Sequence, residues 1–322
     1  MQHYWSLDDV YLDGCWQTIG SFDGVHLGHQ TLLKELIIGA HKKSLPAVVL
    51  TFHPHPAVVL RNRQNHTYLT SPEEKAKLLG NLGVDIVVTH PFTRELSNMS
   101  ARDFVARMHR HLRMTHLYVG YDFALGRGRE GNIAVLRLLG EEFDYRLNVI
   151  NPVEMEGEKV SSSQIRNALF DGEVEKARRL LGRPYNLGGM VIQGDGRGRL
   201  LGIPTANLQV WKERALPKSG VYICQAYLEA KIYKAVTNVG YRPTFDNRSL
   251  TTVVETHILD FNQDLYGKTI ELSFMARLRD EQKFPDVQTL IEQILYDIER
   301  ARSFQIDGAV IERRTDEGET IS

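Results

Sequence analysis

Two histidines and three glycines follow the first strand-like run of the chain. His26, Gly28 and His29 form an HxGH motif, and Gly20 and Gly24 precede it. Glycine allows a tight strand-to-helix turn and a close approach of ligand to backbone. The start of a helix favours anions, and two imidazoles there can donate to a triphosphate and stabilise charge on phosphorus. The motif predicts phosphate chemistry. A helix cap with incidental histidines, or half of a metal site, is the alternative.

Three consecutive serines open another predicted helix. Ser161, Ser162 and Ser163 offer acceptors for capping and donors for phosphate. Arg166 supplies a planar fork that matches phosphate oxygens. Taken alone, the pattern also describes a serine-capped surface helix. Together with HxGH it indicates nucleotidyl transfer, because that reaction needs donors on both sides of the triphosphate.

A glycine-rich stretch in the second half offers a further phosphate site. Backbone amides of such a loop can cradle phosphates, and arginines add charge. The hydroxyl of Thr205 and the side-chain carbonyl of Asn207 are oxygen ligands suited to Mg²⁺. The sequence contains no GxxxxGK[ST] pattern, so the loop is not a P-loop. The predicted phosphate-binding residues of the stretch are Gly194, Gly196, Arg197, Gly198 and Arg199.

Residues 126–131 satisfy the pattern GxGxxG and precede a predicted helix. A dinucleotide-binding fingerprint turns directly off the first strand and has an acidic residue about 20 positions later. Here the glycines follow the fourth predicted strand instead. We therefore interpret the stretch as a glycine-rich active-site loop and not as a dinucleotide site.

The first half of the chain alternates strand-like and helical patterns. Apolar runs predict strands, and longer periodic runs beginning near residues 28, 100 and 133 predict helices. This alternation favours a parallel sheet with helices on both faces, whose ligands bind at the carboxyl ends of the strands. The predicted strands cover residues 16–20, 47–52, 85–89, 117–119 and 145–150.

The pattern of predicted elements changes after about Leu181. Strand-like runs replace the alternation, and only residues 286–302 have a helical period. A small antiparallel barrel or sandwich followed by one helix is the expected architecture. The predicted strands cover residues 190–192, 220–228, 231–239, 250–258 and 269–274. We expect domains at 1–181 and 182–306 and a polar tail at 307–322.

Composition excludes several classes of protein. Lys plus Arg number 39 against 40 for Asp plus Glu, so the net charge of -1 gives no electrostatic case for nucleic acid or an anionic membrane. No uninterrupted apolar run approaches the length of a membrane span. Cys15 and Cys224 cannot build a disulfide framework. We expect a cytoplasmic chain with small-molecule substrates, monomeric or weakly self-associating, that binds neither nucleic acid nor membrane.

The motifs resemble the bacterial bifunctional riboflavin kinase and FMN adenylyltransferase (FAD synthetase) family. HxGH with a later SSxxxR-type helix is similar to the HxGH nucleotidyltransferases, and residues 20–26, 51–56 and 119–128 resemble the FAD synthetase branch. The glycine loop with PTAN at 204–207 resembles riboflavin kinases. Further similar stretches follow in family order at residues 217–222, 238–245, 254–261, 264–267 and 277–284.

The resemblance implies a Rossmann-like nucleotidyltransferase domain and a riboflavin kinase barrel, with ATP, riboflavin and FMN as substrates and Mg²⁺ as the metal. In the first domain His26, His29 and Arg166 would stabilise the triphosphate while AMP passes to FMN. Asp122 would orient a substrate. The implied phosphate-binding set there is Gly20, Phe22, Gly28, Asp122, Ser161, Ser162 and Ser163.

In the second domain the resemblance implies that Glu255 takes the proton of the riboflavin hydroxyl as that oxygen attacks the γ-phosphate. By composition alone, Glu255 is an exposed carboxylate of a strand. Thr205 and Asn207 would hold metal and phosphate. The implied flavin-binding residues are Asn238, Arg279 and Phe284.

Departures from the family pattern are small. The third serine stands where threonine is usual, Ile203 stands where phenylalanine is commoner, and Asp246-Asn247 replace a glycine-containing turn. None removes a group that the chemistry needs.

Two alternatives differ in their use of these motifs. One is an adenylyltransferase for another acceptor, such as a nicotinamide nucleotide or phosphopantetheine, with a non-catalytic flavin-binding barrel. The other is a flavin-binding regulatory module without turnover. The first predicts no riboflavin phosphorylation, and the second predicts flavin binding without ATP consumption.

Overall fold

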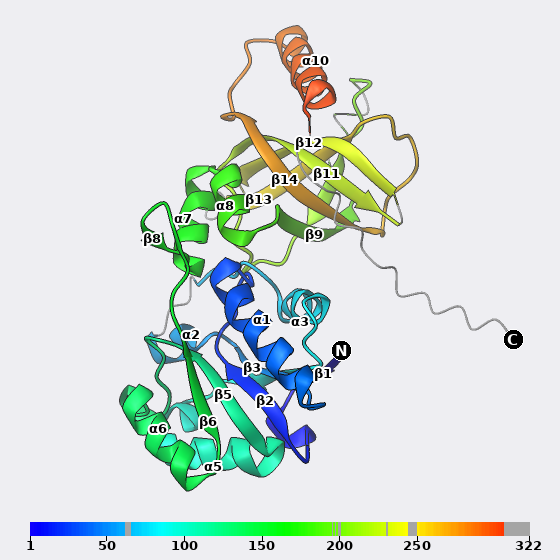
Figure 1. Ribbon diagram of the computed structural model, residues 1–322. Coiled ribbons are helices and arrows are strands. Elements are labelled where there is room, and N and C mark those ends of the chain that lie inside the picture. Colours follow the sequence, from blue (N-terminus) through cyan, green and yellow to red (C-terminus); the bar gives the residue numbers. More distant parts are fainter. Residues whose placement is uncertain are drawn as a thin grey trace, which may run out of the picture.

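The computed structural model describes residues 1–61, 66–194, 196, 198, 201–229, 231–243 and 250–305. Figure 1 shows a parallel-sheet domain below and a barrel domain above. Two helices, α7 (Ser162–Asp171) and α8 (Val174–Leu181), lie where the two domains meet.

A six-stranded sheet forms the centre of the first domain. Its strand order is β1-β4-β3-β2-β5-β6, and every pair is parallel, as predicted. The short edge strand β1 was not predicted; three residues are too few for a periodicity signal. The strands are β1 (Gln2–Tyr4), β2 (Cys15–Ile19), β3 (Ala47–His53), β4 (Ile86–Pro91), β5 (Met114–Gly120) and β6 (Arg146–Ile150).

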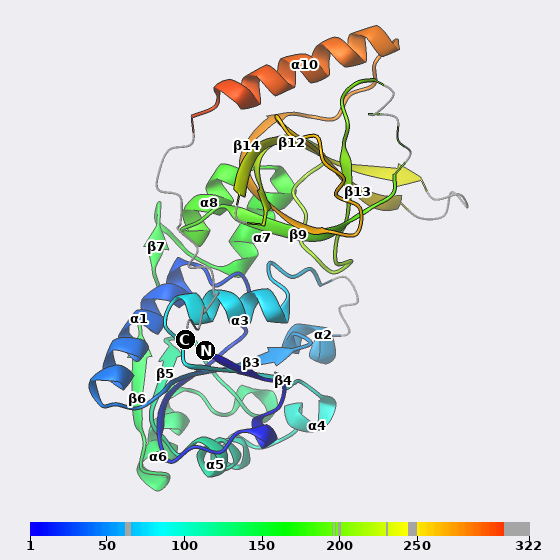
Figure 2. The same ribbon diagram turned by 90° about the vertical axis from the view of Figure 1, so that its right-hand side faces the viewer.

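Helices cover both faces of this sheet because successive strand residues point to opposite sides. Val49 of β3 packs in one cluster with α1 (Leu27–Lys42) and α3 (Pro72–Asn81). Leu50 packs in another with α5 (Ala101–Leu112) and α6 (Ile133–Glu142). The predicted two-faced sheet is thereby confirmed. Figure 2 shows α3 on the side of the sheet next to the barrel. The domain also contains the short helices α2 (Pro56–Arg61) and α4 (Arg94–Ser97) and the antiparallel pair β7 (Glu154–Met155) and β8 (Glu158–Lys159).

The strand order reverses between β2 and β5. From β2 the chain proceeds to β3 and β4 on one side and later returns to place β5 on the other side. Ligands of parallel sheets bind outside the carboxyl ends of the strands at such a switch point. The HxGH residues follow β2 directly, so the topology places this motif where a ligand is expected.

The second domain is a closed antiparallel barrel with the order β10-β13-β12-β11-β14-β9. The sequence predicted either a barrel or a sandwich. The six strands form a closed sheet, so the domain is a barrel. β10 was not predicted, since its four residues include the polar pair Asn207 and Gln209. The strands are β9 (Tyr185–Ile192), β10 (Ala206–Gln209), β11 (Gly220–Leu228), β12 (Lys231–Pro243), β13 (Leu250–Ile258) and β14 (Thr269–Arg279).

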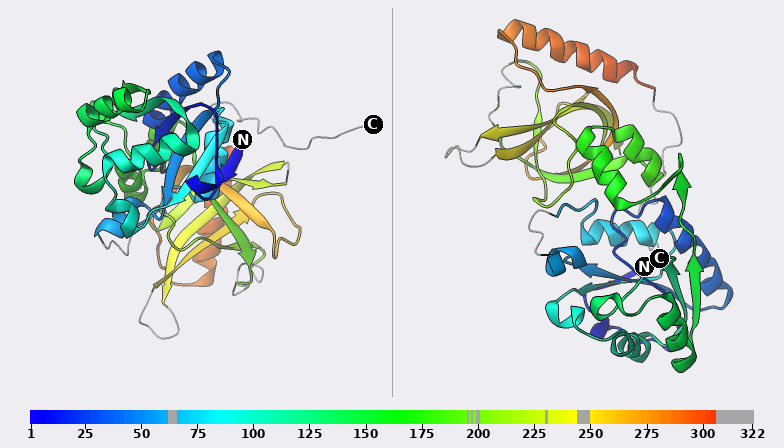
Figure 3. Two further views of the ribbon diagram at one scale, coloured as in Figure 1. Left: turned by 90° about the horizontal axis from the view of Figure 1, so that it is seen from below. Right: turned by 90° about the vertical axis from the view of Figure 1, so that its left-hand side faces the viewer.

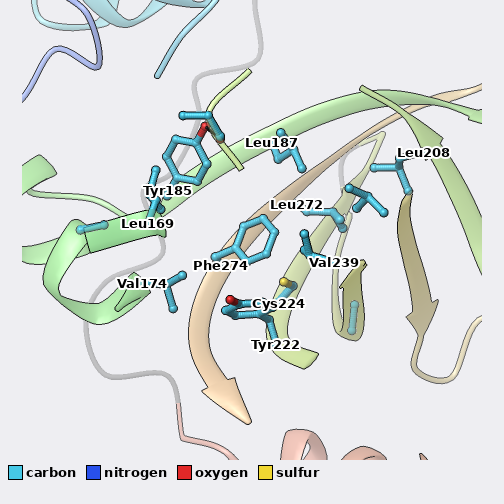
Figure 4. Packing of buried hydrophobic residues seen from close by; sticks show 14 of the residues in the cluster. Leu169, Val174, Tyr185, Leu187, Leu208, Tyr222, Cys224, Val239, Leu272 and Phe274 are labelled. Carbon is cyan, nitrogen blue, oxygen red and sulfur yellow. Dashed lines mark hydrogen bonds between the residues drawn. The ribbon is translucent and has the colours of Figure 1, made fainter. Parts of the chain in front are cut away.

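The core of the barrel continues into α7 and α8. Tyr222 and Phe274 are fully buried and meet edge to face, with ring centroids 5.3 Å apart. Leu169 of α7 and Val174 of α8 belong to the same cluster (Figure 4). In the right-hand view of Figure 3 both helices lie between the barrel and the parallel-sheet domain. One hydrophobic core therefore joins the two halves of the chain.

The terminal helix α10 (Val287–Ser303) packs on the outside of the barrel, at the end remote from the parallel sheet. Its buried face includes Ile298 and Ala301, which cluster with Val236 and Met275. The predicted helix is confirmed. Across the described ranges, no helix has the length and apolar character needed to cross a membrane.

Candidate active sites

A cavity of about 670 Å³ opens where β2 and β5 end and where α1 and α7 begin. Every residue predicted for the N-terminal site lines it, although they come from three separate stretches of the chain. These residues are Gly20, Phe22, His26, Gly28, His29, Asp122, Ser161, Ser162, Ser163 and Arg166.

The rings of the two histidines of the motif are stacked; His26 is buried and His29 is partly buried. Their ring centroids are 3.6 Å apart, and the Nδ1 atoms of both have no hydrogen-bond partner among the described residues. Burial, followed by the nearby charges of Lys159 and Arg183, lowers the pKa of His26 to about 4. Burial also holds the pKa of His29 well below its usual range. Both rings are therefore neutral at neutral pH, and each offers one N–H donor and one acceptor.

Two glycines of this turn lie close to neighbouring side chains. Gly24 has φ +78°, and an added Cβ there would lie 2.7 Å from the side chain of Leu69. A Cβ on Gly28 would lie 3.2 Å from the ring of His26. Gly28 therefore makes room for the histidine ring as well as for a ligand.

The start of α7 connects the serines to the HxGH turn. The hydroxyl of Ser161 accepts from the amide of Gln164 and caps the helix, and Ser162 donates to the carbonyl of Asp23 at 2.8 Å. Arg166 donates through Nε to the carbonyl of Thr67 at 3.0 Å. Its NH2 lies 3.5 Å from Asp23 Oδ2, and its buried NH1 has no partner among the described residues. NH1 is thus a buried donor on a residue that lines the cavity.

Asp122 is paired with a residue that the sequence reasoning missed. Lys159 lies 2.7 Å from its Oδ2 and 4.5 Å from the ring centroid of Tyr121. All three residues line the cavity. A basic residue two positions before the serine run was the available signal.

Two further histidines of the cavity were also missed. His55 and His66 are stacked with centroids 4.5 Å apart, and both line the cavity. Burial, followed by the charge of His66, lowers the pKa of His55 to about 3. The stretch TFHPHP carried the signal for His55, whereas nothing in the sequence marked His66.

The interpretation of residues 126–131 as an active-site loop stays a prediction. None of these residues lines the cavity. A Cβ on Gly126 would lie 2.6 Å from the backbone nitrogen of Ala101, and one on Gly131 would lie 2.7 Å from the Ala101 Cβ. The glycines let this turn pack against the first turn of α5.

The barrel carries the second site, between its outer face and α10. A cavity of about 270 Å³ is lined by Gly196, Gly198, Thr205, Asn207, Asn238, Glu255 and Arg279 among the predicted residues. A neighbouring cavity of about 330 Å³ shares Gly196 and Thr205 with it. Arg197 and Arg199 lie outside the described residues. Gly194 lines neither cavity, but its Cα faces the side-chain amide of Asn207 so closely that a Cβ would overlap it.

Strand register brings three of these residues into one row. Glu255 on β13 is paired with Asn207 on β10 and with Asn238 on β12. The next residues, Thr237 and Thr256, are fully buried and hydrogen-bonded at 2.9 Å. Since side chains alternate along a strand, the row with Glu255 points to the outer face of the barrel. Asn238 Oδ1 is buried with no partner among the described residues.

Arg279 is held by α10. Asp297, which is 2% exposed, accepts from Arg279 Nε at 2.9 Å and lies 2.8 Å from its NH2. Both residues line the smaller cavity. Phe284 lies outside that lining, with its ring centroid 5.8 Å from the guanidinium of Arg279. Asp297 was missed because one acid among the apolar residues of a helix has no distinctive spacing.

His257 is a further lining residue that the sequence reasoning did not select. Its Nδ1 lies 2.8 Å from the carbonyl of Pro204, which directly precedes Thr205. The imidazole thus fixes the turn that leads into β10. Alternation with Glu255, two residues earlier on the same strand face, was the available signal.

No group of three His, Cys, Asp or Glu side chains within the described ranges could hold a metal. The oxygens of Thr205 and Asn207 form a sparse donor set. Mg²⁺ suits such a set, because it usually keeps several waters and shares substrate phosphates with one or two protein ligands. The residues present therefore fit a metal that arrives with ATP.

Comparison with known proteins agrees with this division. The family model described as FAD synthetase matches residues 9–164, and the one described as riboflavin kinase matches residues 181–305. A bifunctional riboflavin kinase/FMN adenylyltransferase of Listeria monocytogenes is 38% identical over 288 residues, covering 89% of this chain and 91% of the relative. The Escherichia coli protein of the same description is 36% identical, covering 93% and 95%.

A crystal structure of a macrolide-efflux protein from Streptococcus pneumoniae superimposes with a TM-score of 0.86 at 32% identity. The match covers 94% of this chain and 99% of that one. The arrangement of both domains is therefore shared over almost the full length. With both family models matched and relatives similar along nearly the whole chain, the protein belongs to the bifunctional riboflavin kinase/FMN adenylyltransferase family.

Proposed function

We propose that the barrel cavity phosphorylates riboflavin to FMN through Glu255 and that the N-terminal cavity adenylylates FMN to FAD through His26, His29 and Arg166. The family carries both activities. One observation supports this assignment of residues. Residues of the HxGH and serine motifs line the cavity of the N-terminal domain, and residues of the glycine-rich and PTAN motifs line a different cavity in the barrel domain. We also propose 1–181 and 182–306 as the two functional domains, followed by the tail 307–322.

In the N-terminal cavity a phosphate oxygen of FMN attacks the α-phosphorus of ATP, and pyrophosphate leaves. Neutral His26 and His29 donate to the triphosphate, and the partnerless NH1 of Arg166 adds a charged donor. Their role is to stabilise the negative charge that develops as the bond to pyrophosphate breaks. No covalent intermediate is needed, since binding both reactants in one cavity aligns them for direct displacement.

In this proposal Asp122 and Lys159 separate when substrate binds. Lys159 lies 2.7 Å from Asp122 Oδ2, and both residues line the cavity. When an anionic substrate enters, Lys159 exchanges the carboxylate for a phosphate, and Asp122 becomes free to accept from a sugar hydroxyl. The two residues thereby orient the bound nucleotide.

In the barrel cavity Glu255 accepts the proton of the ribityl hydroxyl as this oxygen attacks the γ-phosphorus of ATP. Thr205 and Asn207 would hold Mg²⁺ together with the phosphates, and a metal bound there would supply charge neutralisation at the phosphoryl oxygens. Glu255 and Asn207 occupy paired positions, so the base and the metal ligand face the same reacting group.

Asn238 and Arg279 bind the flavin in this account. Asn238 has a buried Oδ1 available for a donor, and Arg279 is aimed by Asp297. Phe284 stacks beside Arg279 as a cover over the flavin. Small-molecule substrates and two free, buried cysteines support the cytoplasm as the compartment. A monomer or weak self-association stays a prediction that light scattering can test.

Chromatography of flavins after incubation with ATP, Mg²⁺ and either riboflavin or FMN tests the assignment. The wild type should form FMN and FAD. His29→Asn should form FMN and stop there, whereas Glu255→Gln should form FAD only when FMN is supplied. His41→Asn and Glu229→Gln, both at exposed ion pairs outside the cavities, are the controls. FAD formed by His29→Asn at the wild-type rate would contradict the N-terminal assignment.

A further inference from the structure

A short segment of the N-terminal domain pairs its backbone with the barrel domain. The amide of Tyr68 donates to the carbonyl of Glu213 at 2.7 Å, and the amide of Ala215 donates to the carbonyl of Tyr68 at 2.8 Å. Tyr68 and Arg214 thereby form an isolated parallel bridge. The segment 67–68 is thus fixed by residues that follow β10 of the barrel.

Side chains on the barrel side hold this bridge in place. The ring of Trp211 packs on the ring of Tyr68, with centroids 5.1 Å apart. Arg214, which is 6% exposed, donates to the hydroxyl of Tyr185 at 2.9 Å and pairs with Glu74 of α3. The segment 211–215 is therefore anchored to both domains and packs against Tyr68.

The other side of segment 67–68 faces the adenylyltransferase cavity. The carbonyl of Thr67 accepts from Arg166 Nε at 3.0 Å, and the hydroxyl of Tyr68 accepts from the amide of His55 at 2.9 Å. Thr67, Arg166 and His55 all line the cavity. The direction of the Arg166 fork therefore depends on a carbonyl whose position is set from the barrel.

From these contacts we propose that Trp211, in the riboflavin kinase domain, is a positioning residue for adenylyl transfer in the other domain. It holds Tyr68, hence the Thr67 carbonyl, and so aims NH1 of Arg166 into the cavity. The inference rests on the proposed role of Arg166. A guanidinium whose Nε anchor moves no longer presents NH1 to the triphosphate, and misplacement by about 1 Å can cost up to 10²-fold in rate.

The test uses Trp211→Ala in the full chain and measures both activities on the same sample. Adenylylation of FMN should lose between tenfold and a hundredfold in kcat/KM for ATP, with the KM for FMN unchanged. Riboflavin phosphorylation should stay at the wild-type rate. Trp211→Phe, which keeps an aromatic ring against Tyr68, should restore most of the loss. Tyr296→Ala, which removes an exposed aromatic of α10, is the control.

A double variant separates positioning from general destabilisation. If Trp211 acts through Tyr68, then Trp211→Ala combined with Tyr68→Ala should be no worse than Tyr68→Ala alone. An equal loss of both activities in Trp211→Ala, or no loss in either, overturns the inference. Should Trp211→Ala not fold, Trp211→Leu and Trp211→Phe provide the same comparison, and a full-rate Trp211→Leu likewise overturns it.

Arg166→Lys distinguishes the proposed role of Arg166 from the proposed role of Trp211. Full adenylylation by Arg166→Lys would contradict the proposed role of Arg166 itself. An impaired Arg166→Lys beside an unimpaired Trp211→Ala would leave the proposed function standing and would overturn only the inference about Trp211.

Discussion

Asn207 on β10 and Glu255 on β13 are directly paired residues of neighbouring antiparallel strands. Paired residues on one face have Cβ atoms about 5 Å apart, which is close enough for both to reach one bound group. Asn238 is the partner of Glu255 on its other side. The register of the barrel alone therefore places the proposed base between a proposed metal ligand and a proposed flavin ligand.

Loss of the Asn207 amide should disable the kinase and leave the other site intact. In Asn207→Ala we expect riboflavin phosphorylation to fall at least about a hundredfold, because an oxyanion-stabilising or metal-holding group is typically worth that much. The Mg²⁺ concentration for half-maximal rate should rise. Initial rates over a Mg²⁺ series measure both. Gln209→Ala, an exposed site on the same strand, is the control. An unchanged Mg²⁺ dependence would argue against Asn207 as a ligand.

Gly194 should matter through the same amide although it lines no cavity. A Cβ at this position overlaps the Asn207 side chain, so Gly194→Ala should displace the amide and reproduce most of the kinase loss seen with Asn207→Ala. FMN adenylylation should be unaffected. Gly188→Ala, whose Cβ would meet only an ordinary contact at 3.7 Å, is the matched control. If Gly194→Ala and Gly188→Ala phosphorylate riboflavin at equal rates, the close approach of Gly194 to Asn207 has no function.

Asp297 should act on riboflavin binding through Arg279. Asp297→Asn keeps the shape but removes the charge that aims the guanidinium, so the KM for riboflavin should rise about tenfold, as expected for the loss of charge-assisted hydrogen bonds. Adenylylation should not change. Steady-state kinetics with riboflavin and with FMN provide the measurement, and Glu299→Gln at an exposed position of α10 is the control. A fall in kcat at constant KM would instead assign Arg279 to the phosphoryl group.

Acid should destabilise the N-terminal domain through its buried histidines. The pKa of His26 is about 4 in the folded chain and 6.5 in the unfolded chain, so the unfolded state binds the proton first as pH falls. Stability is complete above pH 6.5 and is lost as pH falls towards 4. Between pH 7 and 4.5 this group alone should cost roughly 2–3 kcal/mol in the free energy of unfolding.

Urea unfolding of wild type and His26→Asn at the two pH values measures this cost. The variant should lose correspondingly less stability on acidification. Part of the acid destabilisation should remain in the variant, because the pKa values of His29 and His55 are also lowered by burial. His41→Asn, at a half-exposed ion pair, is the control. Identical pH dependence of wild type and His26→Asn would show that His26 does not titrate in this range.

Local pattern predicted most of the elements, and most of the predicted site residues that the structure describes line a cavity. Buried strands such as β3 and amphipathic helices such as α5 carry periodicities that survive in any context. The glycine spacing of residues 126–131 reflects close packing against Ala101, so this spacing alone does not identify a ligand site.

Contacts formed only by the tertiary structure could not be predicted. His66 and Asp297 reach their cavities from segments with no distinctive spacing. The Tyr68–Arg214 bridge joins residues from separate domains. The core shared by α7, α8 and the barrel extends across the change in sequence pattern near residue 182. Such pairings depend on how finished elements pack, which one sequence does not encode locally.

Mixing two variants tests whether one chain carries two independent sites for successive reactions. Glu255→Gln and His29→Asn are each incubated with riboflavin, ATP and Mg²⁺, and then together, and FAD is measured by chromatography. We predict no FAD from either variant alone and FAD from the mixture, because FMN made by the barrel of one chain is adenylylated by the other. FAD from a single variant, or none from the mixture of folded variants, would contradict the account.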